Sequence, residues 1–409
     1  MEYIIERDIE KEILKWLNAR EILAIRGPRQ SGKTTLLYKI MTFLKRDFHE
    51  KRIHFISFED DIEKEKFEKA PKEYLEFYIG EDKEKHFFLL DEVQYIKIAG
   101  KLLKLVYDSM NNIKIIVTGS STLDINEVGS YLVGRVLFFE LYPLSFSEFL
   151  KAKSEQIHAY YIKNKIDLNG KKEINTLFLD KLNPLLKEYI TFGGYPKIVL
   201  EKDVEKKKFL LKNLYLTYIE KDIVKVYGIN YRQKIFDLIK YLASINSSII
   251  NYDSICSQIG FYNKELRQIL SILEDTYVIR LIKPFHKNLI TELRKNPKNY
   301  FIDSGLRNFI VGRFDFSEDE LGKLYENHVL NIFRKEKVNF WRTTAKAEVD
   351  FILSEKIPIE VKLHPKITRS LRSFILTYNP KIVFVANMNL FEKHIIEKSQ
   401  VLFVPLALI

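Results

Sequence analysis

A complete phosphate-binding loop stands near the start of the chain, where residues 27–34 read Gly-Pro-Arg-Gln-Ser-Gly-Lys-Thr. The two glycines of this G-x-x-x-x-G-K-[ST] pattern let the backbone curl until successive N–H groups point at a phosphate. The lysine neutralises phosphate oxygens, and the threonine hydroxyl is a ligand for Mg²⁺. An apolar strand pattern at 22–25 precedes the loop and a helical pattern at 35–40 follows it, so the phosphate would meet a helix N-terminus. We therefore predict that ATP and Mg²⁺ bind here, with nucleotide contacts from Gly27, Pro28, Arg29, Gln30, Ser31, Gly32, Lys33, Thr34 and Thr35.

An acidic pair supplies the second half of such a site. Asp91 and Glu92 end the apolar run of residues 86–92. We expect Asp91 to hold Mg²⁺ through water and Glu92 to polarise the water that attacks the phosphate. The next apolar strand, 113–121, ends in Thr-Gly-Ser-Ser, where the Ser120 hydroxyl either senses the γ-phosphate or only forms a turn. The pattern therefore predicts a metal site made by Thr34 and Asp91 and a catalytic role for Glu92.

Length and charge limit the classes of protein to which this chain can belong. Its 409 residues carry 66 Lys and Arg against 55 Asp and Glu, a net charge of +11, which suits either a polyanionic partner such as DNA or a well-solvated surface. Cys256 is the single cysteine, which excludes an intrachain disulfide framework and a multi-cysteine zinc site. The charged N-terminus is unlike a signal peptide and there is no run of about 18 apolar residues, so we expect a cytoplasmic protein without a membrane segment.

The order of strand and helix signals predicts an α/β protein of several domains. Strand and helix patterns alternate through about the first 150 residues, as a parallel sheet requires. A mostly helical stretch follows, interrupted at Asn183-Pro184 and at 193–196, and then three short helical patterns and a strand in the order of a winged helix-turn-helix. The predicted domains are a phosphate-loop ATPase core with a parallel sheet at 1–150, a helical lid at 151–230, a winged helix at 231–290 and an α/β domain at 291–409.

The third helical pattern of the winged helix is a candidate recognition helix. It carries Asn263, Lys264, Arg267 and Gln268, which can reach phosphates or base edges when such a helix enters the major groove. Many winged helices contact only protein, so the residues leave both a DNA contact and a protein contact open.

A second set of polar residues lies near the C-terminus. Residues 348–362 contain two apolar strand patterns joined by a short polar turn, which predicts a hairpin. Glu360 and Lys362 are two residues apart and project from the same face, and Asp350 lies near the start of the partner strand. Two carboxylates that bind Mg²⁺ beside a lysine that stabilises charge suit the hydrolysis of a phosphodiester. The alternative is a salt-bridged hairpin, although polar residues on otherwise apolar strands argue against it.

Several strings of the chain resemble the prokaryotic and archaeal AAA-type ATPases related to the signal-transducing ATPases. They are GPRQSGKTT, FFLLDEVQ, IVTGSS, the Gly-Arg at 134–135 and PLSFSEFL at 143–150. The likeness continues through 192–196, 218–223 and 300–307, and so covers nearly the whole chain. By this resemblance, Arg135 contacts phosphate or fixes the strand that carries the sensor. Pro196 packs near the adenine from the lid, unless 193–196 is only a turn that breaks a helix.

The C-terminal residues are similar to the core of the PD-(D/E)XK nucleases, in which Asp350 is followed by Glu360-Val361-Lys362. Glu326, in a preceding helical stretch, matches the further acidic residue of that family. The resemblance implies a restriction-endonuclease-like domain, metal ligands at Glu326, Asp350 and Glu360, and catalytic roles for Glu360 and Lys362. Because such folds can persist without catalysis, the residues leave open whether this site cuts DNA.

The leading hypothesis is an AAA-type ATPase that binds and hydrolyses ATP and acts on DNA through the winged helix and the nuclease-like domain. The residues leave open whether the chain forms a homo-oligomer. The alternative is a signalling or regulatory ATPase that uses bound ATP or ADP as a switch and carries an inactive nuclease fold. A third class, a transcription regulator, would bind a specific DNA sequence with little dependence on ATP.

Overall fold

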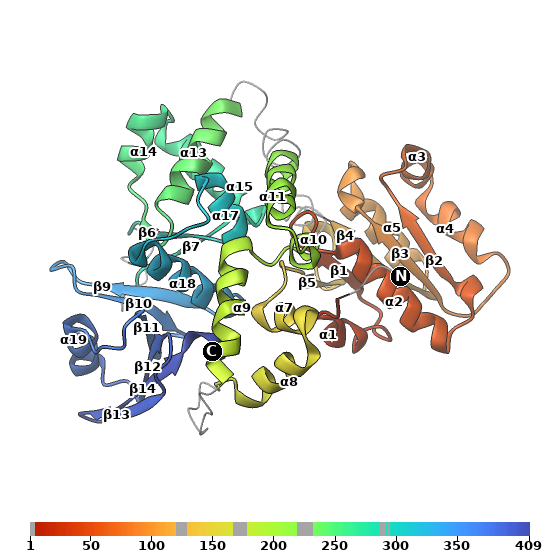
Figure 1. Ribbon diagram of the computed structural model, residues 1–409. Coiled ribbons are helices and arrows are strands. Elements are labelled where there is room, and N and C mark those ends of the chain that lie inside the picture. The colour runs from red at the N-terminus through yellow and green to blue at the C-terminus, as the bar shows by residue number, and fades with distance from the viewer. Residues whose placement is uncertain (1–4, 120–128, 167–177, 219–231, 286–291, 293–294) are drawn as a thin grey trace. The chain divides into compact units, whose positions relative to one another are not determined.

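A computed structural model gives the fold and describes residues 5–119, 129–166, 178–218, 232–285, 292 and 295–409. The chain forms two compact units, whose elements are labelled in Figure 1. The first unit is residues 1–143 together with 275–277, and the second is residues 144–274 and 278–409. The first unit thus ends before the predicted domain boundary at 150, and the second contains the elements predicted for the other three domains.

A five-stranded parallel sheet lies at the centre of the first unit, with the order β2-β3-β4-β1-β5. Strands β3 and β4 are buried along their whole length, as expected for strands that are covered on both faces. The α/β fold class predicted for this part of the chain is confirmed. The strands are β1 (Ile22–Arg26), β2 (Ile53–Ser57), β3 (His86–Asp91), β4 (Ile113–Gly119) and β5 (Val136–Glu140).

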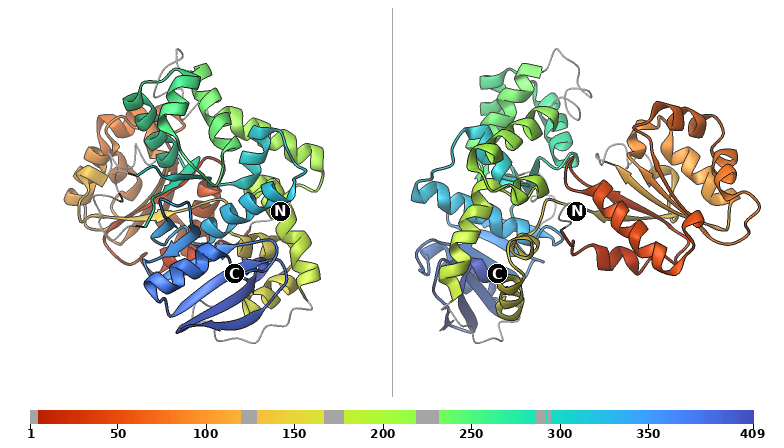
Figure 2. Two further views of the ribbon diagram at one scale, coloured as in Figure 1. Left: turned by 90° about the vertical axis from the view of Figure 1, so that its left-hand side faces the viewer. Right: turned by 45° about the vertical axis from the view of Figure 1, so that its right-hand side comes forward.

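Helices form layers on both faces of this sheet, as Figure 2 shows. Leu23 and Ile25 of β1 pack in one buried cluster with Leu37 of α2, whereas Ala24 packs in the other with Leu103 of α5. Alternate residues of β1 therefore face opposite helix layers, which explains its continuous apolar sequence. The described helices are α1 (Glu10–Leu14), α2 (Lys33–Asp47), α3 (Asp61–Lys69), α4 (Pro71–Ile79) and α5 (Ala99–Ser109).

The second unit begins with a helical region that differs from the prediction at one point. Helix α9 runs through Pro184, so the predicted break at Asn183-Pro184 is wrong. A proline removes one backbone hydrogen bond, and the burial of Leu182 and Leu186 on one face of α9 outweighs that loss. The second predicted break is confirmed, because α9 ends at Phe192 and Pro196 begins the next helix. The described helices are α7 (Phe146–Lys153), α8 (Glu155–Asn164), α9 (Leu179–Phe192), α10 (Pro196–Leu200) and α11 (Val204–Tyr218).

Helix α17 (Ser304–Val311) packs closely against the end of α9. Asp303 accepts hydrogen bonds from the N–H of Leu306 at 2.8 Å, which caps α17, and from the N–H of Gly194 at 2.7 Å. The Asn308 amide donates to the carbonyls of residues 190 and 191, at 2.9 and 3.0 Å, near the end of α9. Burial raises the pKa of Asp303 to about 6. These contacts join two of the strings that carried the resemblance, 192–196 and 300–307.

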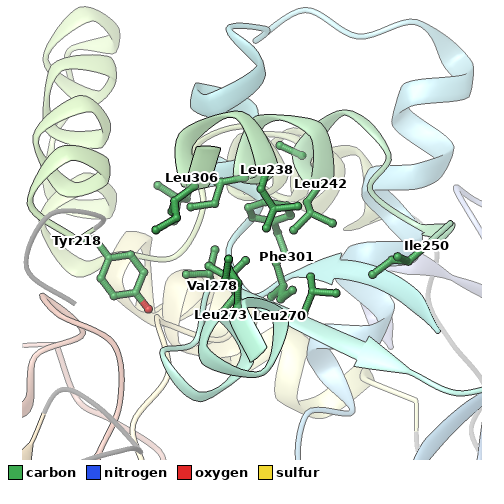
Figure 3. Close-up of a cluster of buried hydrophobic side chains, with 14 of the residues drawn as sticks. Tyr218, Leu238, Leu242, Ile250, Leu270, Leu273, Val278, Phe301 and Leu306 are labelled. Carbon is green, nitrogen blue, oxygen red and sulfur yellow. The ribbon is translucent and has the colours of Figure 1, made fainter. Parts of the chain in front are cut away.

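Three helices and a small antiparallel sheet follow, with the strand order β6-β8-β7. Figure 3 shows that Leu238 and Leu242 of α13 and Leu270 and Leu273 of α15 converge on Phe301 of β8. Strand β8 belongs to this sheet although it lies beyond the predicted boundary at 290. The elements are α13 (Arg232–Ser244), β6 (Ser248–Ile249), α14 (Tyr252–Ile259), α15 (Asn263–Asp275), β7 (Ile279–Ile282) and β8 (Lys298–Phe301).

A six-stranded mixed sheet ends the second unit, with the order β13-β14-β12-β11-β10-β9. Strands β9, β10 and β11 form an antiparallel meander, and β12 pairs with β11 in parallel after helix α19. Leu371 and Phe374 of α19 pack with Trp341 and Val385 of the sheet. The hairpin β13-β14 was not predicted. The elements are α18 (Glu318–Ile332), β9 (Val338–Arg342), β10 (Glu348–Leu353), β11 (Ile357–Val361), α19 (Arg369–Tyr378), β12 (Ile382–Asn387), β13 (Glu392–Ile396) and β14 (Ser399–Pro405).

Candidate functional site

The predicted phosphate loop connects the end of β1 to the start of α2. Its backbone enters the left-handed region at Gln30, where φ is +59°, and at Gly32, where φ is +97°. A Cβ atom on Gly27 would lie 2.1 Å from the carbonyl oxygen of Leu141, just after β5. Gly32 therefore allows the turn and Gly27 the close approach to β5. Helix α2 begins directly after Gly32, so the helix N-terminus, with the positive end of its dipole, lies beside the loop.

The Lys33 ammonium lies inside this loop. The side chain is 4% exposed and donates to the carbonyl oxygens of Gly27 and Pro28, each at 3.0 Å. Both acceptors are backbone oxygens of the loop, so the ammonium charge sits where the sequence pattern expects a phosphate to be neutralised.

Thr34 and Asp91, the residues predicted to hold Mg²⁺, are in direct contact. The Thr34 hydroxyl donates to one Asp91 oxygen at 2.8 Å, and the Thr118 hydroxyl donates to the other. Burial raises the pKa of Asp91, while the hydrogen bonds from both threonines act in the opposite direction. A hydroxyl and a carboxylate are the hard oxygen donors that Mg²⁺ prefers, so the pair fits this ion.

A backbone hydrogen bond holds Glu92 next to Thr34 and Asp91. Its N–H donates to the Thr118 hydroxyl at 3.1 Å, and its φ of +56° turns the chain sharply after β3. The Gln94 amide donates to the Glu92 carboxylate. Thr118 thus links the predicted metal ligand Asp91 to the predicted catalytic Glu92, and neither Thr118 nor Gln94 was predicted to have a role.

Arg7 also supports the loop, although no pattern in the sequence singled it out. Its side chain is 6% exposed and donates to the Ser31 carbonyl at 2.8 Å and to the Tyr142 carbonyl at 2.6 Å. A guanidinium has several donors in a fixed plane, which suits it to bridge two backbone oxygens. Arg7 therefore fixes the loop to the chain segment that follows β5.

Three further residues were predicted to contact nucleotide, and the structure tests the position of one of them, Arg135. Ser120 lies outside the described residues, and Pro196 begins α10 in the other unit, so its contact with adenine stays a prediction. Arg135 directly precedes β5, whose first residue pairs with Ile22 at the start of β1. The loop follows the last residue of β1, so Arg135 lies at the opposite edge of the sheet, where it pairs with Asp108 of α5 at 2.8 Å. Because strands rise by about 3.3 Å per residue, this position argues against a contact of Arg135 with phosphate in the same chain, and its other implied role, fixing the strand that carries the sensor, stays a prediction.

In the second unit, Asp350 of β10 and Glu360 of β11 lie beside Lys362, as predicted. One Asp350 oxygen accepts from the Val361 N–H at 2.8 Å and from the Lys362 ammonium at 3.4 Å. The Lys362 ammonium lies 3.2 Å from a Glu360 oxygen, which also accepts from the Thr368 hydroxyl at 3.1 Å. We call Asp350, Glu360 and Lys362 the inner half of the acidic site.

The predicted acidic residue Glu326, on α18, lies beside two groups that were not predicted. The Lys298 ammonium is 2.5 Å from a Glu348 oxygen and 3.8 Å from a Glu326 oxygen, and the Tyr300 hydroxyl donates to Glu326 at 3.3 Å. Arg342 lies on the far side of Glu348 at 3.3 Å. We call Glu326, Glu348 and Lys298 the outer half of the acidic site.

The predicted metal ligands of the acidic site lie in two groups, each beside a lysine. Within the described part of the chain, no group of three or more His, Cys, Asp or Glu side chains is arranged to hold a metal ion. Lysine ammonium groups lie beside these carboxylates, and metal binding by Glu326, Asp350 and Glu360 stays a prediction. Burial, and next the charge of Asp350, raise the pKa of Glu326 and of Glu360. Burial lowers the pKa of Lys362, but the negative charges of Asp350 and Glu360 raise it by more. The net effect is a raised pKa for Lys362.

The residues of the predicted recognition helix lie on α15. Lys264, Arg267 and Gln268 are exposed, and the Arg267 guanidinium donates to the Asn263 side chain at 2.8 Å. The same guanidinium stacks over the Tyr252 ring at 4.2 Å from its centroid. These residues share a solvent-facing side of α15, because Leu266, Ile269 and Leu270 are buried on the other.

Across the described residues, no helix is long and apolar enough to span a lipid bilayer.

Three family models match successive parts of the chain. Residues 19–150 match an AAA domain, residues 183–317 a domain of unknown function (DUF8612), and residues 321–408 a domain of unknown function (DUF4143). The solved structure of PCH-2 from Caenorhabditis elegans is 15% identical with a TM-score of 0.34, and the match covers 54% of this chain and 64% of that one. A TM-score this low supports no conclusion about function.

Relatives from a bacterium and from an archaeon match most of the chain. An uncharacterized protein of Haemophilus influenzae is 25% identical over 84% of this chain and 82% of its own length. The uncharacterized protein MJ1544 of Methanocaldococcus jannaschii is 30% identical over 86% of this chain and 75% of its own length. The chain therefore belongs to the same protein family as MJ1544, and its residues 19–150 are an AAA-type P-loop ATPase domain.

Proposed function

We propose that the first unit binds ATP with Mg²⁺ and hydrolyses it. The observation that carries this proposal is the contact of Thr34 with Asp91, which Thr118 connects to Glu92. Thr34 and Asp91 would hold Mg²⁺, which neutralises charge on the β- and γ-phosphates when it is bound. Lys33 adds positive charge inside the loop, and Glu92 is the side chain available to orient the attacking water and accept its proton.

Glu92→Gln is expected to lower the rate of ATP hydrolysis about a hundredfold or more while ATP still binds. The amide keeps the size of the side chain and can still pair with Gln94, but it cannot accept a proton. Phosphate release at saturating ATP measures the rate, and titration with a fluorescent ATP analogue measures binding.

Glu65→Gln is the matched control, because it removes the same charge from an exposed position on α3. It should change neither hydrolysis nor binding. Hydrolysis at the wild-type rate by Glu92→Gln would contradict the role proposed for Glu92. Loss of ATP binding in that variant would show instead that Glu92 maintains the shape of the site.

We further propose that the second unit acts on DNA. The order α13-β6-α14-α15-β7-β8 supports a winged helix, with the exposed Lys264, Arg267 and Gln268 facing outward. The order α18-β9-β10-β11-α19-β12 supports a nuclease-like domain, since neighbouring strands bring Asp350 and Glu360 beside Lys362. The net charge of +11 favours a polyanionic partner for the whole chain.

The proposed nuclease activity is tested on end-labelled single-stranded, duplex and branched DNA with Mg²⁺ or Mn²⁺. Wild type is expected to cut at least one of these substrates. Asp350→Ala and Lys362→Ala should each lower the rate about a hundredfold, because each removes a charge that the reaction needs. Lys356→Ala, in the exposed turn of the same hairpin, is the control for lost positive charge and should cut like wild type. Equal cutting by wild type and Asp350→Ala would indicate a contaminating nuclease.

A specific observation favours a second candidate, a nucleotide switch with an inactive nuclease fold. The Lys298 ammonium lies beside Glu326, one of the metal ligands that the family resemblance implies, and pairs with Glu348. This candidate predicts slow ATP turnover, ADP that copurifies with the protein, and no cutting of any DNA tested. The two assays, run on one purified sample, therefore separate the two functions.

A further inference from the structure

Lys298 is an unusual residue for the place that it occupies. It is the first residue of β8, in the small sheet of the second unit, yet its side chain is 3% exposed and its ammonium lies among carboxylates of the C-terminal sheet and α18. The ammonium also lies 5.4 Å from the centroid of the Phe340 ring. A lysine is almost never this buried unless its charge is paired. The carboxylates of Glu326 and Glu348 provide that pairing.

The backbone around Lys298 fixes it in the outer half of the acidic site. Lys298 pairs with Ile282 on one side and with Ile249 on the other, so β8 is the central strand of its sheet. The Asn327 side chain accepts from the Phe301 N–H at 2.9 Å and donates to the Phe301 carbonyl at 2.8 Å. Asn327 directly follows Glu326 on α18, so the lysine and the carboxylate are held by one framework. Moving the Lys298 backbone away would require β8 to break its pairing with both neighbouring strands. Lys298 is therefore a permanent part of the acidic site, not a residue that moves in and out of it.

The inner half of the acidic site differs in one respect. Glu360 is 2% exposed, and its second oxygen, Oε2, has no hydrogen-bond partner among the described residues. A buried carboxylate oxygen without a partner is costly, and a bound cation would satisfy it. Each half thus holds a lysine ammonium, Lys298 or Lys362, and the inner half also has a buried carboxylate oxygen, Glu360 Oε2, that is available to a cation.

We propose that Lys298 is a built-in cation that takes the place of a divalent ion in the outer half of the acidic site. A divalent ion then enters only the inner half, at Asp350 and Glu360, and Glu326 binds none while Lys298 is present. This inference rests on the proposed role of the acidic site as a place that cations enter, but not on its cutting DNA. Removal of the Lys298 charge leaves Glu326 and Glu348 without their buried partner, so a divalent ion becomes the group that can neutralise them.

The test counts Mn²⁺ ions bound by nucleotide-free full-length protein, with the free ion measured by electron paramagnetic resonance. All variants carry Asp91→Asn, so that Mn²⁺ at the phosphate loop does not contribute. Lys298→Met is expected to bind about one more Mn²⁺ per chain than this parent, and Mn²⁺ in hundredfold excess over its Kd should raise the Tm of that variant by about 5 °C or more. Lys295→Met removes the same charge from an exposed position three residues earlier and should bind as the parent does.

Two further comparisons decide the proposal. Glu326→Gln in the parent, which retains Lys298, should leave the number of bound Mn²⁺ ions unchanged, and the gained ion should disappear when Glu348→Gln is added to Lys298→Met. A parent that loses a Mn²⁺ through Glu326→Gln would overturn the proposal, as would a folded Lys298→Met that gains none. If Lys298→Met does not fold, Lys298→Gln replaces it, and the Glu326→Gln comparison stands by itself. DNA cutting is not measured, so failure of the nuclease proposal would be seen separately.

Discussion

Lys33→Ala is expected to lower kcat/KM for ATP hydrolysis on the order of a thousandfold and to remove the rise in Tm that ATP gives the wild type. The lysine ammonium lies inside the loop, where it donates to the carbonyl oxygens of Gly27 and Pro28. A phosphate that enters the loop meets this charge in a nearly water-free position, where an electrostatic contact is stronger than at the surface. Alanine leaves the backbone N–H groups in place, but they must then hold the phosphates without a counter-charge.

The measurements are phosphate release over a range of ATP concentrations and thermal unfolding with and without ATP and Mg²⁺. Lys45→Ala is the matched control, because Lys45 lies on the same helix in an exposed pair with Glu50. Such a pair is worth about 1 kcal/mol or less, so the control should keep both activity and the ATP-dependent shift. An ATP-dependent rise in Tm that survives undiminished in Lys33→Ala would contradict the proposed role of Lys33 in binding the phosphates.

Residues close together in the sequence made most of the two sites predictable. The phosphate loop needs only eight consecutive residues, and the acidic pair at 91–92 is recognised because it ends an apolar strand. Asp350, Glu360 and Lys362 were brought together by a hairpin with a short turn, whose length sets which residues face one another. In each case the geometry is local, so the spacing of residue types carries the information.

Lys298 and Arg7 could not be found in this way. Both are buried cations whose partners lie far away in the sequence, and strand pairing or packing between distant segments decides where they point. A lysine or arginine in a charged chain is expected at the surface, so neither pattern nor composition distinguishes these two from the other basic residues. The strand pairing of β8 and the packing of the N-terminal segment are what show where the side chains of Lys298 and Arg7 lie.

Arg135 is a different case, because a topological rule already excluded it from the nucleotide. In a parallel sheet, ligands bind at the carboxyl ends of the strands. Arg135 precedes its strand, which places it at the amino end, whereas the phosphate loop follows β1. The family resemblance offered either a phosphate contact or a role in fixing the sensor strand, and the direction of β5 argues against the first of these within one chain.

Gly305→Ala is expected to destabilise the second unit by at least about 3 kcal/mol. The position is the second residue of α17, and an added Cβ would lie 2.0 Å from the carbonyl oxygen of Phe192 and 2.6 Å from the nitrogen of Gly193. These atoms are backbone, so no side chain can rotate away to relieve the clash. Urea unfolding followed by far-ultraviolet circular dichroism, with limited proteolysis to locate the loosened region, measures the effect.

Helix α17 has little freedom to move away from the clash. The Asn308 amide donates to two carbonyls near the end of α9, and the Asp303 carboxylate accepts from the N–H of Gly194. These hydrogen bonds fix the approach of α17 to α9 on both sides of Gly305. Gly322→Ala is the matched control within α18, where an added Cβ meets no atom within 4 Å. That change should stabilise by about 0.5–1 kcal/mol, because alanine favours a helix more than glycine does. Equal unfolding midpoints for Gly305→Ala and wild type would mean that α17 slides along α9 despite these hydrogen bonds, and the junction would then be a flexible one.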